Sequence, residues 1–299
     1  MKPNVLESNT RIEHDLLGEL AVPADAYYGV QTARALENFQ ISGVELQLYP
    51  NFIKALAMVK LAAARANFEL GQFPREILTG IEGACQEILD GKLHDQFRLD
   101  VLQGGAGTST NMNANEVIAN RALELMGHRK GEYKYCDPHD HVNCSQSTND
   151  AYPSAMHVGM ALGNVQLVAA IRELIQAFRT KGKEFGAILK MGRTQLQDAV
   201  PMTLGQEFNA FAQTLAGEVL ALESVQRALY EVNMGATAIG TGLNAPQGYA
   251  EKCVGHLAKI TGFPIHLAED LIEATQDTQA FVLYLLHEEP RHQAGKGLQ

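Results

Sequence analysis

The feature that most limits how this chain can fold is a pair of unusually long helical patterns. Residues Ala151–Leu189 and Thr203–Val232 both exceed the usual length of a helix in a globular protein. The second pattern carries apolar residues at near-heptad spacing: Leu204, Phe208, Phe211, Leu215, Val219, Leu222, Val225, Leu229 and Val232. Helices of this length need partners along their whole course. We therefore predict a mainly α fold that contains a long-helix bundle.

Other segments also favour helices. An alanine-rich helix is predicted from Pro50 to Leu70, and a second one begins at Pro74 and ends before Gly91. Shorter helices are expected around residues 251–260 and 269–284. Gly and Pro residues interrupt the sequence of residues 1–49, which predicts short irregular elements. Few stretches alternate β-branched residues, and there is no βαβ rhythm, so a parallel sheet is not expected.

Composition and charge argue against several classes of partner. The formal net charge of −10 and the lack of a basic run disfavour nucleic acid and anionic membranes. The four cysteines form no CxxC pair, so neither a zinc site nor a disulfide framework is indicated. The N-terminal residues lack an apolar signal core, and no uninterrupted apolar run looks long enough to span a bilayer. We expect a soluble cytoplasmic protein that binds neither nucleic acid nor membrane.

Three segments rich in hydroxyl and amide side chains precede helical patterns. They are GGAGTSTNMNANE at Gly104–Glu116, SQSTNDAYP at Ser145–Pro153 and GRTQLQDAVPMTLGQEF at Gly192–Phe208. The predicted caps are Asn113 with Glu116, Asn149 or Asp150, and Thr203 with Gln206. Uncharged donors at helix N-termini favour anions. The three segments together predict a shared anion site, and capping alone is the simpler alternative.

Two possible metal motifs carry less weight. His287 and Glu288 resemble the start of HExxH, but His292 is one position too far and Pro290 would break the helix. One group of side chains could also form a metal cluster: Asp137, His139, Asp140, His141 and Cys144. A polar turn with solvated histidines explains this group more simply. Neither a P-loop nor a GxGxxG after a strand is present, so we expect no metal site and no nucleotide cofactor.

The polar segments, taken in order, resemble the aspartase/fumarase superfamily. The resemblance rests on GTSTNMNANEV, HVNCSQSTNDAYP and GRTQLQDAVPMTLGQEF. It extends through RIEHDLLGELAVPADAYYGVQT, GATAIGTGLNAP and AEDLIEAT, and so covers about Arg11 to Tyr284. Within the superfamily the motifs are closer to aspartate ammonia-lyases than to fumarases. In particular, Gln195 follows Arg193 and Thr194, where fumarases commonly have histidine.

The resemblance implies a fold, a reaction and an assembly. The fold would be a long-helix bundle with a smaller, mostly helical N-terminal domain, and the subunits would form a homotetramer in which three subunits build each active site. The reaction would be the reversible elimination of ammonia from L-aspartate to give fumarate, without an organic cofactor. The expected parts are residues 1–147 as the N-terminal lyase domain, 148–284 as part of the central bundle and 285–299 as a divergent tail.

The resemblance also implies which residues bind substrate. Carried over position by position, Thr108, Ser147 and Thr148 would hold a substrate carboxylate. Asn149 would lie near the amino group and that carboxylate, and Thr194 with Gln195 would contact the other end. A base removes a proton from the carbon beside one carboxylate, which then carries two negative charges. Each donor aimed at that group can contribute about 3 kcal/mol in a dry site.

The sequence departs from the family pattern after Tyr284. The family signature GSSxMPxKxNP, whose serine is the catalytic base, is absent, so no catalytic residue is identified. We expect a C-terminally truncated or frameshifted chain that is inactive alone. The tail contains Gln293-Ala294-Gly295, which matches the QAG that precedes that signature in the family. Lys296 and Gly297 then stand where the signature has serines. The alternatives are a fumarase-type hydratase and a non-catalytic fragment that co-assembles with complete subunits.

Overall fold

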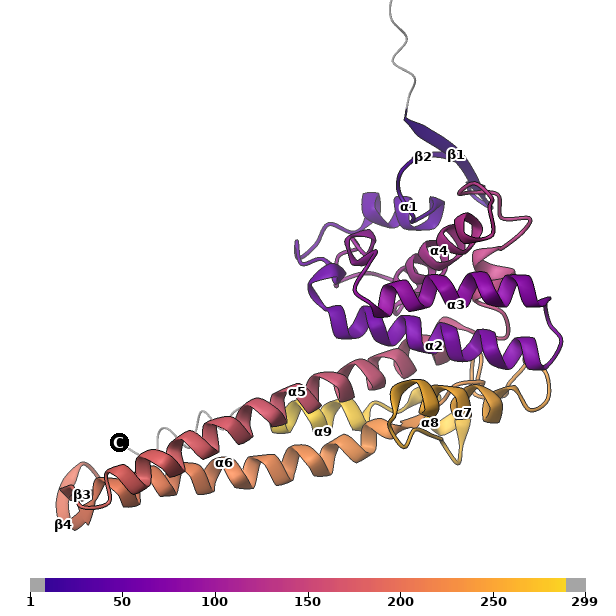
Figure 1. The fold of residues 1–299 in the computed structure, drawn as a ribbon. Coiled ribbons are helices and arrows are strands. Elements are labelled where there is room, and N and C mark those ends of the chain that lie inside the picture. The colour runs from indigo at the N-terminus through magenta and orange to yellow at the C-terminus, as the bar shows by residue number, and fades with distance from the viewer. Residues whose placement is uncertain (1–8, 289–299) are drawn as a thin grey trace, which may run out of the picture. The chain divides into compact units, whose positions relative to one another are not determined.

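The structure, a computed structural model, describes residues 9–288, which fold as two units (Figure 1). The first unit comprises Met1–Gly159 and Tyr230–Asp277, and the second comprises Met160–Leu229 and Thr278–Gln299. Helix α5 (Thr148–Glu184) begins in the first unit and continues into the second. Each unit is discontinuous in sequence, and the expected boundary at residue 148 stays a prediction. Residues 289–299 of the expected tail, with Pro290, His292 and Gln293–Gly297, lie outside the described residues, as do the side chains of His287 and Glu288.

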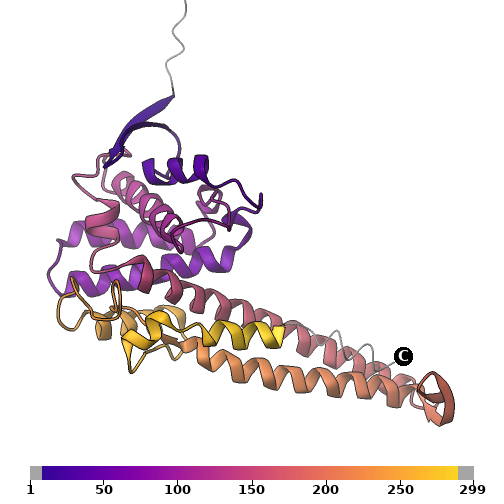
Figure 2. The ribbon, with the colours of Figure 1, turned by 180° about the vertical axis from the view of Figure 1, so that it is seen from behind.

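Packed helices form the core of the first unit (Figures 1 and 2). Helix α2 (Pro50–Glu69) packs against α3 (Arg75–Leu89) and α7 (Tyr249–Thr261), and α3 packs against α4 (Thr108–Leu125). Proline stands in the first turn of α2 and at the N-cap of α3, and Gly71 with φ of 72° follows the end of α2. These features confirm the bounds predicted for α2 and α3, because proline suits a helix start and left-handed glycine a helix end.

Short elements complete the first unit. They are β1 (Thr10–Asp15), β2 (Gly18–Pro23), α1 (Val30–Asn38), η1 (Leu46–Leu48), η2 (His94–Gln96), the π-helical turn η3 (Pro138–Val142), β5 (Glu231–Val232), β6 (His266–Leu267) and α8 (Leu271–Gln276). Strands β1 and β2 form an antiparallel hairpin, and β5 pairs with β6 in parallel. The single helix expected over residues 269–284 is instead two helices, because the chain is extended at Asp277.

The second unit is organised around two long helices, as the sequence predicts. The later part of α5 packs against α6 (Leu204–Gln226) through Val168, Ile175, Ala212, Val219 and Leu222. The N-terminus of α6 carries the predicted capping box between Thr203 and Gln206. The 3₁₀ turn η4 (Arg227–Tyr230) directly follows α6 in the chain. Helix α9 (Gln279–Glu288) also contacts α6.

Three expectations about this region were wrong. Helix α6 ends at Gln226, before residue 232, because the chain continues as the 3₁₀ turn η4 and then as strand β5, which pairs with β6. Helix α5 ends at Glu184, before residue 189, because the chain then turns into a hairpin of β3 (Leu189–Thr194) and β4 (Gln197–Thr203). The statement that no apolar run could span a bilayer was also too strong. Among the helices in residues 9–288, α5 is long and apolar enough to do so by length and composition alone. Because α5 also supplies Val168 and Ile175 to the core of the second unit, we interpret it as a bundle helix.

Candidate active site

The second polar segment forms the start of α5. The Ser147 hydroxyl oxygen accepts a hydrogen bond from the Asn149 backbone N–H at 3.2 Å, and the Ser147 N–H donates to the Asp150 carboxylate at 2.9 Å. These reciprocal bonds close the first turn in the manner of a capping box. Ser147 is therefore the cap, and the prediction of Asn149 or Asp150 was wrong because Asp150 is the third helical residue. The Ser147 oxygen acts as an acceptor, so its proton can be donated to a ligand.

Thr148 connects the second polar segment to the first. The buried Asn111 of α4 donates from Nδ2 to the Thr148 hydroxyl oxygen at 3.2 Å, and also to Asn143 Oδ1 at 3.1 Å. Because the Thr148 oxygen accepts this bond, its hydroxyl proton can also be donated to a ligand. The two segments meet here, one turn beyond Thr108.

Helix α4 begins earlier than its predicted cap. Its N-cap is Gly107, with φ of 90°, and Asn113 lies inside the helix, fully buried. Glu116 does not cap α4: its carboxylate accepts the N–H groups of Gly29, Gln31 and Thr32 at the start of α1. The cap prediction failed because these polar side chains of α4 face the interior. Burial raises the pKa of the Glu116 carboxyl to about 7, against the lowering effect of these hydrogen bonds.

Gly107 brings the first polar loop against α5. A Cβ atom at this position would lie 2.7 Å from the ring of Tyr152, so only glycine allows this approach. The neighbouring Thr108 donates its hydroxyl to the Gly105 carbonyl at 2.7 Å. To donate to a substrate carboxylate, the Thr108 hydroxyl would first have to rotate away from that carbonyl.

A cavity of about 540 Å³ lies beside the first turn of α5, within the first unit. It is lined by Ala106, Thr148, Asn149, Tyr152, Pro153, Ala238, Ile239, Ile272, Thr275 and Gln276. Its walls thus come from the first polar loop, α5, the 235–244 loop and α8. Among the described residues the lining is uncharged, and its polar side chains are hydroxyls and amides. A cavity with a few convergent polar groups is typical of a small-molecule site.

Asn149 is fixed on both its side chain and its backbone. Its Nδ2 donates to the Ala238 carbonyl at 2.7 Å, and its own carbonyl accepts from Asn233 Nδ2 at 3.0 Å. The same Asn233 amide donates to the Thr275 hydroxyl at 3.1 Å, which connects α8 to the start of α5. Thr275 and Gln276 were not predicted as cavity residues, although they lie in and next to the AEDLIEAT motif that contributes to the resemblance.

A buried lysine supports the second polar segment from α2. The Lys60 ammonium, with no exposed surface, donates to Asn143 Oδ1 and Gln146 Oε1, both at 2.9 Å. Burial lowers the pKa of Lys60 to about 7, against the raising effect of the nearby Asp150 charge. Sequence reasoning missed this residue. The only signal was a charged residue within an otherwise alanine-rich apolar pattern.

Strained backbone conformations occur in the loops around the cavity. Ala106, Ser145 and Thr237 have φ of 50°, 60° and 57°, in the left-handed region that non-glycine residues rarely adopt. Each lies in a different loop of the first unit. Such strain persists only where surrounding contacts impose it, and it is common at binding sites.

Thr194 and Gln195 lie in the second unit. Thr194 ends β3, and Gln195 with Leu196 forms the two-residue turn to β4, with φ of 47° and 63°. Positive φ at both positions is what a type I′ turn requires. The structure therefore brings Thr148 and Asn149 to one cavity and places Ser147 in the same helical turn. The share of Thr194 and Gln195 in that site stays a prediction.

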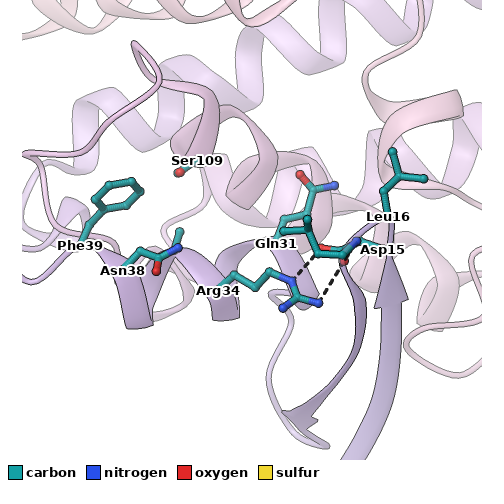
Figure 3. A pocket seen from close by; sticks show the side chains of 9 residues that line it. Asp15, Leu16, Gln31, Arg34, Asn38, Phe39 and Ser109 are labelled. Atoms are coloured by element: carbon teal, nitrogen blue, oxygen red, sulfur yellow. Dashed lines mark hydrogen bonds and ion pairs between the residues drawn. The ribbon is translucent and has the colours of Figure 1, made fainter.

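A second cavity of the first unit, of about 320 Å³, is a weaker candidate for an anion site (Figure 3). Its one cationic side chain among the described residues is Arg34. Figure 3 shows the Arg34 guanidinium against Asp15, with Nε and Nη2 donating to the two carboxylate oxygens at 2.9 and 3.0 Å. The positive charge is thus already balanced. The Arg34 hydrogen bonds also hold the pKa of Asp15 below its usual value.

The histidine-rich turn has a structural arrangement. The Asp137 backbone N–H donates to His141 Nδ1 at 2.8 Å, and the Asp137 carboxylate accepts the N–H groups of His139 and Asp140. Among the side chains that the structure describes, no three His, Cys, Asp or Glu side chains are grouped so as to hold a metal ion.

Comparison with known proteins places the chain in a family. The family described as Lyase matches residues 18–287, which is most of the chain. This chain belongs to the aspartase/fumarase superfamily of lyases. Proteins named aspartate ammonia-lyase from Pseudomonas aeruginosa and Escherichia coli are 59% and 57% identical to it over 278 and 279 residues, which is 93% of this chain in each case. The chain spans 59% and 58% of the length of these two relatives.

Solved structures support the superfamily fold. A structure described as a fumarate lyase:delta crystallin from Brucella melitensis bound to cobalt matches with a TM-score of 0.91 and 52% identity, over 93% of this chain and 60% of that one. A class II fumarase from Schistosoma mansoni matches with a TM-score of 0.86 and 33% identity, over 93% and 61%. The predicted superfamily and the mainly α, long-helix fold are therefore confirmed.

Proposed function

We propose that this superfamily member binds the carboxylates of L-aspartate and fumarate at the cavity beside the first turn of α5, as part of an aspartate ammonia-lyase. The observation that carries the proposal is the hydrogen bonding of the Ser147 and Thr148 hydroxyls. Each oxygen already accepts a hydrogen bond from the protein, at 3.2 Å in both cases, so each proton is available for a carboxylate. Relatives that are 57–59% identical bear the name of this enzyme.

These donors suit the proposed carbon–nitrogen bond cleavage. A base takes the proton from the carbon beside one carboxylate, two negative charges accumulate on that carboxylate, and ammonia then leaves the neighbouring carbon. Hydrogen bonds from fixed hydroxyls strengthen as this charge grows, by about 3 kcal/mol for a well-placed donor. In this proposal Thr108 adds a third donor after rotation, Asn149 Oδ1 accepts from the amino group, and Thr194 with Gln195 contacts the other end.

The residues of this proposal contribute binding groups to the reaction, and none of them is assigned as its base. Its 299 residues contain no GSSxMPxKxNP segment. We therefore expect this chain alone to bind fumarate without converting L-aspartate to it. No organic cofactor or metal enters the proposed chemistry.

A family-type homotetramer is the proposed assembly. Only a third of the apolar window in α5 is buried within this chain. Leu174, Leu220 and Leu286 on α5, α6 and α9 are also exposed. Such apolar helix faces favour burial against further helices. The same exposed apolar faces also support the alternative, a non-catalytic chain that assembles with complete subunits. In either case we propose the cytoplasm as the location.

Substrate binding is tested by Thr148→Val, which removes the hydroxyl and keeps the shape. We expect fumarate, titrated into ¹⁵N-labelled chain, to shift amide signals of residues 147–150, and the variant to bind about tenfold more weakly, since a hydrogen bond to a charged group contributes about 1.5–3 kcal/mol. Thr79→Val is the matched control, because the Thr79 hydroxyl bonds only within α3, to the Arg75 carbonyl. Equal affinities for both variants and the unaltered chain would contradict the assignment.

The rival functions have separate tests. Tighter binding of L-malate than of L-aspartate would favour a fumarase-type enzyme, which the similarity to the class II fumarase supports. Formation of fumarate from L-aspartate by this chain alone, followed by ultraviolet absorbance, would reveal a base outside the proposed set. Size-exclusion chromatography with and without a complete relative measures co-assembly.

A further inference from the structure

We propose that Asp150 is a positioning residue that sets the orientation of the Asn149 amide through the 235–238 loop. This inference rests on the proposed function. Asp150 Oδ2 accepts the backbone N–H groups of Gly235 at 3.1 Å and Thr237 at 3.0 Å, and Oδ1 accepts that of Ser147 at 2.9 Å. One carboxylate thus joins two loops that are more than eighty residues apart in sequence.

The loop held by Asp150 does not adopt a relaxed conformation. Thr237 has φ of 57°, and Gly235 has φ of 93° with Ala250 so close that a Cβ atom would lie 2.5 Å from it. Left-handed backbone at a residue such as Thr237 is costly unless other contacts impose it. The Asp150 side chain, with no exposed surface, supplies such contacts. Burial raises the pKa of its carboxyl to about 6, against the lowering effect of the three N–H donors.

By holding Thr237, Asp150 also positions the next residue of the loop. Ala238 directly follows Thr237, and its carbonyl accepts the Asn149 Nδ2 proton at 2.7 Å. With Nδ2 committed to this bond, Asn149 Oδ1 is the acceptor that remains for a ligand. L-Aspartate carries an ammonium group with three N–H donors, whereas fumarate carries none. Asp150 therefore supports recognition of the amino group more than recognition of the carboxylates.

The test is Asp150→Asn, which keeps the shape and replaces one acceptor oxygen by an NH₂ group facing backbone N–H donors. We expect the affinity for L-aspartate to fall about tenfold and the affinity for fumarate to fall less, with the Gly235 and Thr237 amide signals displaced. Asp100→Asn is the matched control. Asp100 is also buried and accepts the N–H groups of Ile41, Ser42 and Gly43, at 2.7–3.0 Å, in a loop that does not line the cavity. This control should leave both affinities unchanged.

The outcomes separate this inference from the proposed function. If the unaltered chain binds neither ligand, the proposed function is refuted and the inference falls with it. If the unaltered chain binds both but Asp150→Asn lowers the two affinities equally, or not at all, only the positioning role is refuted. If Asp150→Asn does not fold, amide hydrogen exchange measured on the unaltered chain tests the positioning role instead. Saturating L-aspartate should slow exchange at Gly235 and Thr237 but not at Ser42 and Gly43, and equal changes in both loops would also overturn the positioning role.

Discussion

Gly107→Ala is predicted to destabilise the first unit and to disturb the candidate site. Two separate costs arise at this position. The φ of 90° lies in the left-handed region, where an alanine costs about 1–2 kcal/mol. The new Cβ would also lie 2.7 Å from ring carbons of Tyr152, and overpacking of this kind costs about 1–3 kcal/mol. The sum is a loss of about 2–5 kcal/mol in the free energy of unfolding.

Gly105→Ala is the matched control for this substitution. Gly105 also has a positive φ, of 77°, but a Cβ there would lie 3.6 Å from Thr108, an ordinary contact distance. This variant should therefore show only the conformational cost, about 1–2 kcal/mol. The difference between the two variants isolates the contact with Tyr152, which lines the cavity. If that contact is the cause, the double variant Gly107→Ala/Tyr152→Ala should lose less stability than the sum of the two single losses, because removing the ring relieves the clash.

Urea unfolding followed by circular dichroism measures both variants, and fumarate titration measures the site. We expect Gly107→Ala to bind fumarate more weakly, because displacement of the Tyr152 ring changes the shape of the cavity. Gly105→Ala should bind as the unaltered chain does. Equal destabilisation by the two variants, with unchanged fumarate affinity, would refute the argument that Gly107 is required by the approach of the loop to α5.

Two further predictions concern a buried carboxyl and a helix cap. Glu116 has a folded-state pKa of about 7 against a usual value of 4.5, so the folded chain holds a proton that the unfolded chain has lost. Stability should therefore fall as pH rises from 4.5 to 7, by at most about 1.4 kcal/mol per pH unit, and Glu116→Gln should flatten this slope in urea unfolding measured across that range. Thr203→Ala removes the capping box of α6 and should cost about 1 kcal/mol. Thermal unfolding measures this loss, and the conservative Thr203→Ser should retain most of the stability.

Helix positions could be predicted where a residue acts on its own neighbours. Pro50, Pro74 and Gly71 mark helix ends by restricting or freeing the local backbone, and Thr203 with Gln206 satisfies local N–H groups. The start of α4 could not be predicted in this way. Its asparagines have the composition of caps, but they are buried and bond to other elements, so tertiary packing overrides their local preference.

The β3–β4 hairpin escaped prediction for a related reason. Its turn residues, Gln195 and Leu196, both have positive φ, although neither glycine nor asparagine is present to favour that conformation. The geometry of the candidate site also depends on contacts between residues that are distant in sequence. Ser147, Thr148 and Asn149 were found from composition and resemblance. The partners of Thr148 and Asn149 lie far away in sequence, as Asn111 and Ala238 do, and no local pattern reveals such contacts.

The placement of charge around the cavity fits a reaction in which charge develops on the substrate. Among the described residues the polar side chains of the lining are hydroxyls and amides, beside apolar side chains such as Ile239 and Ile272. The buried charges of Lys60 and Asp150 attract each other, and both are engaged in hydrogen bonds within the scaffold. A fixed neutral donor binds a doubly charged carboxylate more strongly than a singly charged one, and only this difference in binding accelerates the reaction. In the proposed reaction, neutral donors around the cavity direct binding energy toward the doubly charged intermediate, and the proposed role of Asp150 and Lys60 is to keep those donors in place.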